Sequence, residues 1–116
     1  MSAAHAVLRN CRVSARKARL VADQVRGMQV QKVLDLLALS SKRVARPIRK
    51  LVKSAISNAE VKNDREKAGI DVDNLVVSRI FVDEGASLWR IRARAQGRAN
   101  WIQRRTSHIT VELEER

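Results

Sequence analysis

Hydrophobic residues recur at helical spacing through the first half of the chain and predict three helices. A first helix can be capped by Ser14 and ended by Gly27 in a left-handed conformation. Its apolar positions follow the i, i+3, i+4, i+7 pattern: Ala18, Val21, Ala22 and Val25. A second helix is expected over residues 31–39, with an apolar face of Val30, Val33, Leu34 and Leu37.

The third predicted helix is the longest and spans residues 42–63. Its apolar stripe consists of Val44, Ile48, Leu51, Val52, Ala55 and Ala59. Pro47 should bend the first turns unless the helix begins near Arg46, because proline has no N–H to donate. The polar residues 63–74 (NDREKAGIDVDN) are then expected to form a loop.

The remaining segments predict strands and an α+β fold. Residues 75–83 (LVVSRIFVD) are β-branched and apolar, which indicates a strand that is central or buried on both faces. In residues 106–113, Ile109, Val111 and Leu113 alternate with polar residues, which is typical of a half-buried strand with one wet face. Residues 3–12 could add an extended strand with Val7 or Leu8 turned inward.

The stretch from Gly85 to Arg105 does not fit a core or an ordinary turn. It contains six arginines, no lysine and no acidic residue, and it is far longer than the 2–5 residues typical of hairpin loops. If the arms continue as a ribbon through Gly85 to Trp101, each side would have about 8 residues and the tip would reach roughly 25 Å beyond the body. Trp89 and Trp101 could cover each other across such a ribbon or stack on an unpaired base.

Composition favours one small basic domain. At 116 residues the chain is expected to be a single domain, with a globular body of residues 1–84 and 106–116 and an extended hairpin of residues 85–105. The net charge is +12, and residues 85–105 contribute half of it, which suits nucleic acid first and an anionic membrane surface second. No membrane-spanning run or signal peptide is evident, and the single Cys11 fits a reducing compartment such as the cytosol.

Two further basic groups lie on the predicted helices. Near the start of the first helix the cations are Arg12, Arg16, Lys17 and Arg19, and they are either solvated or gathered around a phosphate bound by free backbone N–H groups. On the third helix they are Lys42, Arg46, Arg49 and Lys53, a stripe that is either solvated or in contact with a partner.

The sequence offers nothing for catalysis. His5, His108 and Cys11 are the only residues of their types, and there is no glycine-rich phosphate loop. Asp71 and Asp73 alternate, but no further oxygen ligands follow at calcium-loop spacing. We therefore expect no enzyme activity, no cofactor and no metal, and binding through arginines, whose planar fork suits phosphates and bases of structured RNA.

Several phrases of the chain closely resemble one family. They are RVSARKARLVADQVRG, SAISNAE, FVDEG, RARAQGRA and RTSHITV, in that order along nearly the whole chain. The chain resembles the large-ribosomal-subunit protein twenty-two family of the bacterial type. The resemblance implies three helices packed on a three-stranded antiparallel sheet, with a long protruding Arg-rich β-hairpin that enters ribosomal RNA and whose tip lines the nascent-peptide exit tunnel.

The resemblance also implies partners and site residues. The partners would be ribosomal RNA of the large subunit, neighbouring ribosomal proteins and the nascent polypeptide, in the cytoplasmic ribosome and without membrane insertion. The RNA-binding positions would be Arg12, Arg16, Lys17, Arg19, Arg90, Arg92, Arg94, Arg98, Arg104, Arg105, Thr106, Ser107 and His108. The tunnel-lining tip would be Trp89, Arg90, Ile91, Arg92, Ala93 and Arg94.

The chain departs from the common pattern of that family at five positions. Ala15, Ala86 and Ala93 stand where proline is frequent, and Trp89 and Trp101 replace residues that are more often basic or aliphatic. The competing hypothesis from the residues is a basic architectural DNA-binding protein, although such proteins often insert apolar wedges between base steps. A membrane-surface protein ranks third, because the basic third helix has no aromatic anchor.

Overall fold

Three helices and five strands follow one another in a computed structural model that describes residues 4–66, 69–93 and 95–116. The strands of the body are β1 (Ala4–Cys11), β2 (Leu75–Glu84) and β5 (Ser107–Glu115). The helices are α1 (Ala15–Val25), α2 (Val30–Leu39) and α3 (Ala45–Glu66). A short 3-10 turn, η1 (Val72–Asn74), precedes β2.

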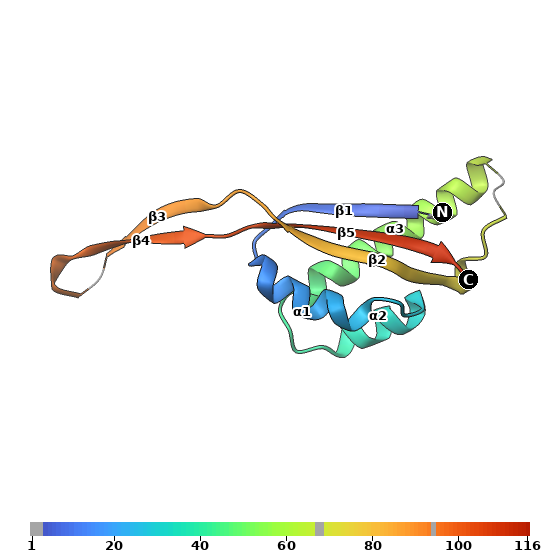
Figure 1. Cartoon of the computed structure of the whole chain (residues 1–116), viewed down its shortest axis with the longest axis horizontal. Helices are drawn as coiled ribbons and strands as arrows, with labels where there is room; N and C mark the ends of the chain where they lie inside the picture. Colours follow the sequence, from blue (N-terminus) through green and yellow to red (C-terminus); the bar gives the residue numbers. More distant parts are fainter. Residues whose placement is uncertain (1–3, 67–68, 94) are drawn as a thin grey trace.

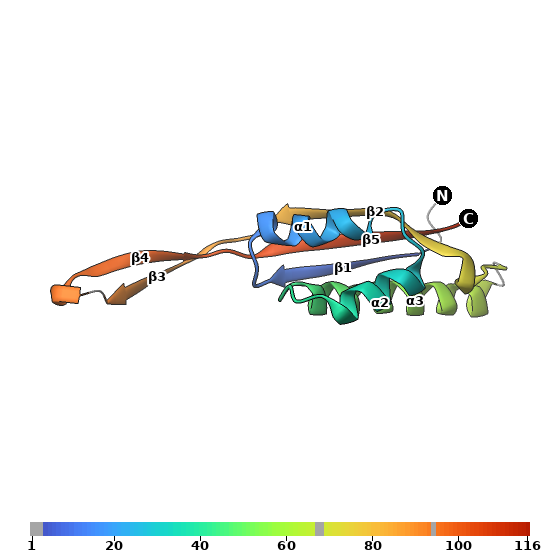
Figure 2. The ribbon, with the colours of Figure 1, turned by 90° about the horizontal axis from the view of Figure 1, so that it is seen from below.

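The three body strands form an antiparallel sheet in the order β1-β5-β2 (Figure 1). Residues on β5 alternate between buried and half-buried, so only one face of the sheet lies in the core. The helices cover that face: α1 packs along β2, α3 packs along β1, and α2 packs on α3 (Figure 2). The predicted α+β class, with three helices on a three-stranded antiparallel sheet, is confirmed.

The core is aliphatic, as the composition requires. Its largest fully buried side chains lie on both layers, among them Ile48 and Val52 of α3 and Ile80, Ile109 and Leu113 of the sheet. All six predicted apolar positions of the third helix are buried. Burial of such side chains supplies about 1.5–3 kcal/mol each relative to exposure, which is the main stabilising contribution in a body this small.

The order of the strands differs from the prediction for residues 75–83. β2 lies at an edge of the sheet and has one buried face, whereas β5 is the central strand. Phe81 lies on the solvent side of the sheet, where it is half-buried under the guanidinium of Arg79, whose central carbon lies 4.8 Å from the ring centre. A central strand needs only one apolar face when the other face of its sheet meets water, so hydropathy alone does not reveal strand order.

The structure decides between the alternatives left open for Pro47 and for residues 3–12, and the third helix begins three residues later than expected. α3 begins at Ala45, so Pro47 lies in the first turn, where its missing N–H leaves no intrahelical bond unmade and no bend is required. On β1, Ala4 and Ala6 are buried and Leu8 packs against the core, whereas Val7 is 44% exposed. Gly27 follows α1 at φ +83°, the left-handed conformation expected of it.

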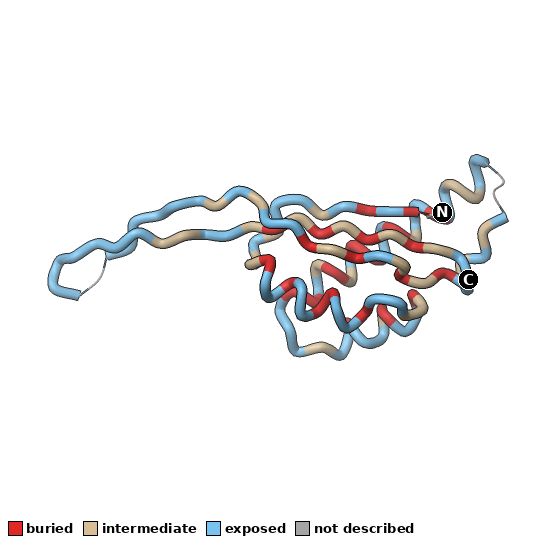
Figure 3. Tube along the Cα trace, viewed as in Figure 1, coloured by how far each residue is buried: buried red, intermediate tan, exposed pale blue. Residues whose placement is uncertain are grey.

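A second, two-stranded sheet extends from the body. Its strands are β3 (Leu88–Ala93) and β4 (Ala99–Arg104), joined by the turn η2 (Ala95–Gly97), and we call residues 85–105 the ribbon. The molecule measures 65 × 27 × 17 Å, and its radius of gyration of 17.4 Å exceeds the value of about 13 Å expected of a compact chain of this length. Nearly all of the ribbon is exposed (Figure 3).

Candidate RNA-binding interface

The base of the ribbon is closed by contacts between residues that precede β3 and residues at the end of β4 or just after it. The N–H of Gly85 donates to the carbonyl of Thr106 at 2.9 Å, and the hydroxyl of Thr106 donates to the carbonyl of Ala86. The side-chain amide of Gln103 donates to the hydroxyl of Ser87 at 2.9 Å. These bonds join the two arms of the ribbon where it leaves the body.

His108 is held beside this base by a bulge in β1. The pairing of β1 with β5 shifts between Leu8 and Cys11, and Asn10 adopts φ +57° there. The Asn10 N–H donates to Nδ1 of His108 at 3.1 Å. Because Nδ1 accepts, the neutral ring carries its proton on Nε2, which remains a hydrogen-bond donor.

Ser107 does not lie on the surface. It shares a face of β5 with Ile109 and is fully buried, and its hydroxyl oxygen has no hydrogen-bond partner among the described residues. The expectation that Ser107 faces RNA is therefore corrected, because strand alternation turns it inward while its neighbours Thr106 and His108 are half-buried.

The cations at the start of α1 lie at the same end of the body as the ribbon. Cys11 pairs with Ser107 at the base of the ribbon, and Arg12 follows immediately. Ser14 caps α1 by accepting the Lys17 N–H at 3.4 Å, as predicted. The side chains of Arg12, Arg16 and Lys17 are all exposed. The free backbone N–H groups and the positive dipole end of α1 add to the positive charge of these side chains.

Arg19 has a structural contact that the sequence did not suggest. Its Nε and one terminal nitrogen donate to the carbonyl of Val82 on β2, at 3.3 and 3.0 Å. Arg26 donates in the same way to the carbonyl of Ile80 at 2.8 Å. The two arginines donate hydrogen bonds to carbonyl groups along the outer edge of β2. Arg19 therefore stabilises the body whether or not it also binds RNA.

The ribbon has two chemically different faces. Directly paired residues share a face, and successive residues alternate between faces. Arg90 and Arg92 of β3 therefore lie on the face of Arg104, which pairs with Leu88. Trp89 and Ile91 lie on the opposite face together with Trp101, which pairs with Ile91. Arg98 follows the turn and Arg105 follows β4, and both are exposed.

The turn of the ribbon lies further along the chain than predicted. Residues 89–93, expected at the tip, form the arm β3, and the turn is made by Ala95–Gly97 with Gln96 at φ +63° and Gly97 at φ +71°. Arg94, assigned to both the tip and the RNA-binding set, lies outside the described residues. The sequence reasoning missed Gln96 and Gly97, although a glycine midway between two alternating segments is a turn signal.

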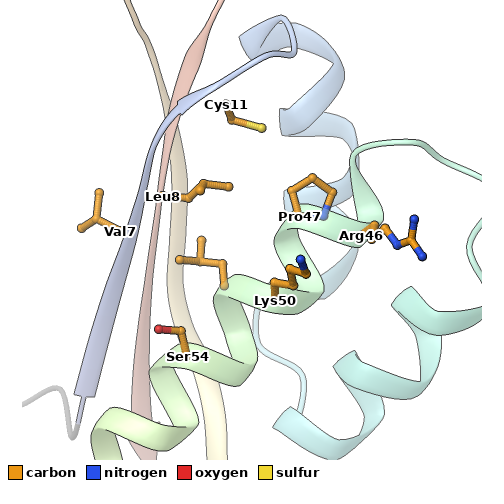
Figure 4. A pocket seen from close by; sticks show the side chains of 8 residues that line it. Val7, Leu8, Cys11, Arg46, Pro47, Lys50 and Ser54 are labelled. Atoms are coloured by element: carbon orange, nitrogen blue, oxygen red, sulfur yellow. The ribbon is translucent and has the colours of Figure 1, made fainter.

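The basic stripe of α3 is only partly free. Lys42 precedes the helix, which begins at Ala45, and is exposed, as are Arg46 and Lys53 on the helix. Arg49 is half-buried, and its Nε has no hydrogen-bond partner among the described residues. Arg46 and Lys50 border an apolar pocket of about 470 Å³ between β1 and α3, whose wall includes Leu8, Cys11, Pro47 and Leu51 (Figure 4). Burial raises the pKa of the Cys11 thiol above its ordinary value.

Few acids neutralise these cations. The ion pairs formed by the described residues are Arg26 with Asp23 at 2.9 Å and Arg79 with Glu112 at 3.8 Å. Neither includes an arginine of the ribbon or a cation at the start of α1. A row of cations without carboxylate partners among the described residues is suited to an external anion.

The described residues contain no group of three or more His, Cys, Asp or Glu side chains that could hold a metal ion. The carboxylate of Asp71 instead accepts hydrogen bonds from Asp73 and Asn74 and so stabilises η1. In the same ranges of the chain, no helix has the length and apolar character needed to cross a membrane.

Comparison with known proteins agrees with this geometry. The sequence profile of the family described as ribosomal protein L22p/L17e matches residues 6–114. The chain is also 53% identical, over 111 residues, to the large ribosomal subunit protein uL22 of Magnetococcus marinus, a match that covers 96% of this chain and 94% of the relative. The chain therefore belongs to the ribosomal protein L22p/L17e family.

Proposed function

We propose that the chain is a structural protein of the large ribosomal subunit that binds ribosomal RNA and holds several RNA segments in fixed relative positions. The family is one of ribosomal proteins and not of enzymes, and the relative from Magnetococcus marinus carries a large-subunit name. The observation that supports RNA binding most directly is the ribbon, which carries six arginines and no acid over residues 85–105.

The proposed interface combines the ribbon with the adjoining end of the body. Arg12, Arg16 and Lys17 would neutralise phosphates at the start of α1, where free N–H groups add donors. The ribbon would enter the RNA, with contacts from Arg90, Arg92, Arg94, Arg98, Arg104 and Arg105, and with Thr106 and His108 near its base. Ser107 is left out because it is buried.

The finer assignment concerns the tip. We propose that the end of the ribbon lines the tunnel through which the nascent polypeptide leaves, and that the body contacts neighbouring ribosomal proteins. The turn Ala95–Gly97 and the flanking Arg98, rather than Trp89, would then be nearest to the nascent chain. The length of the molecule, 65 Å, suits a protein that reaches from one RNA segment to another.

Titration of large-subunit ribosomal RNA with the intact chain over a range of KCl concentrations tests the proposal. If about six phosphates are neutralised, the logarithm of the binding constant should fall against the logarithm of salt with a slope of roughly −4 to −5. A slope near zero would contradict an electrostatic interface. Duplex DNA serves as competitor, and equal affinity for it would favour the architectural DNA-binding alternative.

A charge-matched pair of variants locates the interface. One variant replaces Arg90, Arg92 and Arg98 with Gln, and the other replaces Lys32 in the first turn of α2, Arg65 in the last turn of α3 and Arg116 after β5. These ends of the elements lie at the end of the body opposite the ribbon (Figure 1). The first should make the salt slope shallower by about 2–3 and weaken binding, since three phosphate contacts are lost. Equal losses in both variants would show that net charge alone drives binding.

A further inference from the structure

The second face of the ribbon carries large apolar side chains that nothing in the described chain covers. Trp89 is 58% exposed, Ile91 is 62% exposed and Trp101 is 67% exposed. We call this group the apolar face of the ribbon. Such an exposed apolar group in a projecting element indicates a binding surface.

The tryptophans do not bury each other. In the register of the ribbon, Trp101 lies opposite Ile91 and Trp89 lies opposite Gln103, so the two indole rings are diagonal neighbours. Each tryptophan residue is more than half exposed despite this arrangement. The body offers no cover either, because the ribbon projects away from it (Figure 1).

We propose that the apolar face stacks on unpaired nucleobases of an RNA strand whose phosphates are bound by arginines of the same ribbon. The inference rests on the proposed RNA-binding function and specifies what the second face of that interface recognises. Indole rings offer flat π-surfaces to any base, and base–aromatic stacking tolerates sequence changes.

Charge decides between a nucleobase and other occupants. Arginines alternate with the apolar residues along β3 and project from the opposite face of the same narrow ribbon, so the occupant of the apolar face meets these cations at the edges of the ribbon. The two strands are only about 4.8 Å apart, which lets long arginine side chains at their edges reach phosphates beside the stacked bases. A second copy of this chain, at a net charge of +12, would bring like charges together.

Intrinsic tryptophan fluorescence of the intact chain tests the inference with three RNA probes. The probes are a 12-nucleotide unpaired strand of mixed sequence, an abasic sugar–phosphate strand of the same length, and the corresponding duplex. The unpaired strand should quench the emission, and the abasic strand and duplex should not. Equal quenching by the abasic strand would overturn the inference, because it would require no base.

A double variant, Trp89→Leu with Trp101→Leu, keeps apolar side chains but removes the aromatic planes. We expect it to bind the unpaired strand about a hundredfold more weakly, roughly tenfold per tryptophan, with an unchanged salt slope and unchanged binding to the abasic strand. The matched control, Leu88→Ala with Ile102→Ala, removes apolar side chains from the opposite, arginine-bearing face and should lose much less affinity. Wild-type affinity in the tryptophan variant would overturn the inference.

Two outcomes separate this inference from the proposed function. If the tryptophan variant binds RNA normally but fails to enter assembled large subunits, the apolar face docks on a protein and base stacking is excluded, whereas RNA binding stands. If the wild-type chain binds neither ribosomal RNA nor the unpaired strand at low salt, the proposed function itself fails. Circular dichroism of each variant establishes that its fold is retained.

Discussion

The guanidinium group of Arg19 donates two hydrogen bonds to the carbonyl oxygen of Val82, from Nε at 3.3 Å and from a terminal nitrogen at 3.0 Å. The contact joins the solvent side of α1 to the edge strand β2, and Arg26 repeats it at Ile80. A sheet edge with unpaired carbonyl groups can pair with other chains, so these arginines also protect the edge.

Replacement of Arg19 with Lys should lower the free energy of unfolding by about 0.5–1 kcal/mol, because a single amine cannot reproduce the two-pronged contact in an exposed position. Urea denaturation measures the change. Arg16→Lys is the matched control, since the described structure gives the exposed Arg16 side chain no such bond, and its stability should stay within about 0.3 kcal/mol of wild type. Equal stability of both variants would contradict a structural role for Arg19.

Gly85 lies where the ribbon leaves the body, and a larger residue does not fit there. A Cβ atom at this position would come within 2.6 Å of the Thr106 hydroxyl oxygen and 3.2 Å of two ring atoms of His108. Gly85→Ala should therefore destabilise the protein by about 1–3 kcal/mol, as overpacking does in well-packed sites. Thermal unfolding followed by circular dichroism provides the measurement.

A double variant distinguishes this clash from a general cost of alanine at position 85. Thr106→Ala removes the closest atom, together with its hydrogen bond to Ala86. Combined with Gly85→Ala it should be more stable than the sum of the two single changes, giving a coupling of about 1 kcal/mol. Strict additivity would show that the two side chains do not collide.

Periodicity in the sequence was sufficient for the helices and the core, but not for the order of the strands. Five of the six apolar positions predicted for the third helix lie on its buried face, and Val44, which is also buried, immediately precedes the helix. The central position of β5 depends on which strands pair, and pairing is a non-local choice. The apolar character of residues 75–83 does not require a second layer of protein, because the solvent-facing ring of Phe81 is covered by Arg79.

The candidate site was predictable in composition and less so in geometry. The density of arginines in the sequence was sufficient to identify the ribbon. The register of β3 and β4 was needed to show that Arg90 and Arg92 lie on one face and Trp89 on the other. The sequence also could not indicate that Arg19 is engaged with Val82, because the two residues are 63 positions apart. Ser107 was assigned by family resemblance, and strand alternation turned it inward.

The Cys11 thiol should react slowly while the protein is folded. Its pKa is raised by burial, and the thiolate is the reactive form, so alkylation by iodoacetamide at pH 8 should be slower than in the urea-unfolded chain. The folded state retains the thiol proton to higher pH than the unfolded state does. The contribution of this thiol to the free energy of unfolding is therefore fully present below the unfolded pKa of 9.0. It is lost as the pH rises through the higher pKa of the folded state.

Mass spectrometry of the alkylated protein over time measures both rates. Cys11→Ser gives the background, since the chain has no other cysteine. Equal rates in the folded and unfolded states would show that the pocket beside Pro47 leaves the sulfur open to the reagent.

Removal of the ribbon's charge should leave the stability of the body unchanged. None of Arg90, Arg92 and Arg98 forms a hydrogen bond or ion pair with the body in the described structure, and all three are exposed. When Arg90, Arg92, Arg94 and Arg98 are replaced with Gln, the cost to the free energy of unfolding should stay within about 0.5 kcal/mol, and reduced self-repulsion opposes any loss. Differential scanning calorimetry should then give a thermal midpoint within about 2–3 °C of the wild-type value.

A fall well beyond that range would mean that the ribbon packs on the body in solution, and an interface built from a projecting arm would have to be abandoned. An unchanged thermal midpoint together with weakened RNA binding would show that these arginines act in RNA binding and not in folding, because their contribution to the free energy would appear only in the complex.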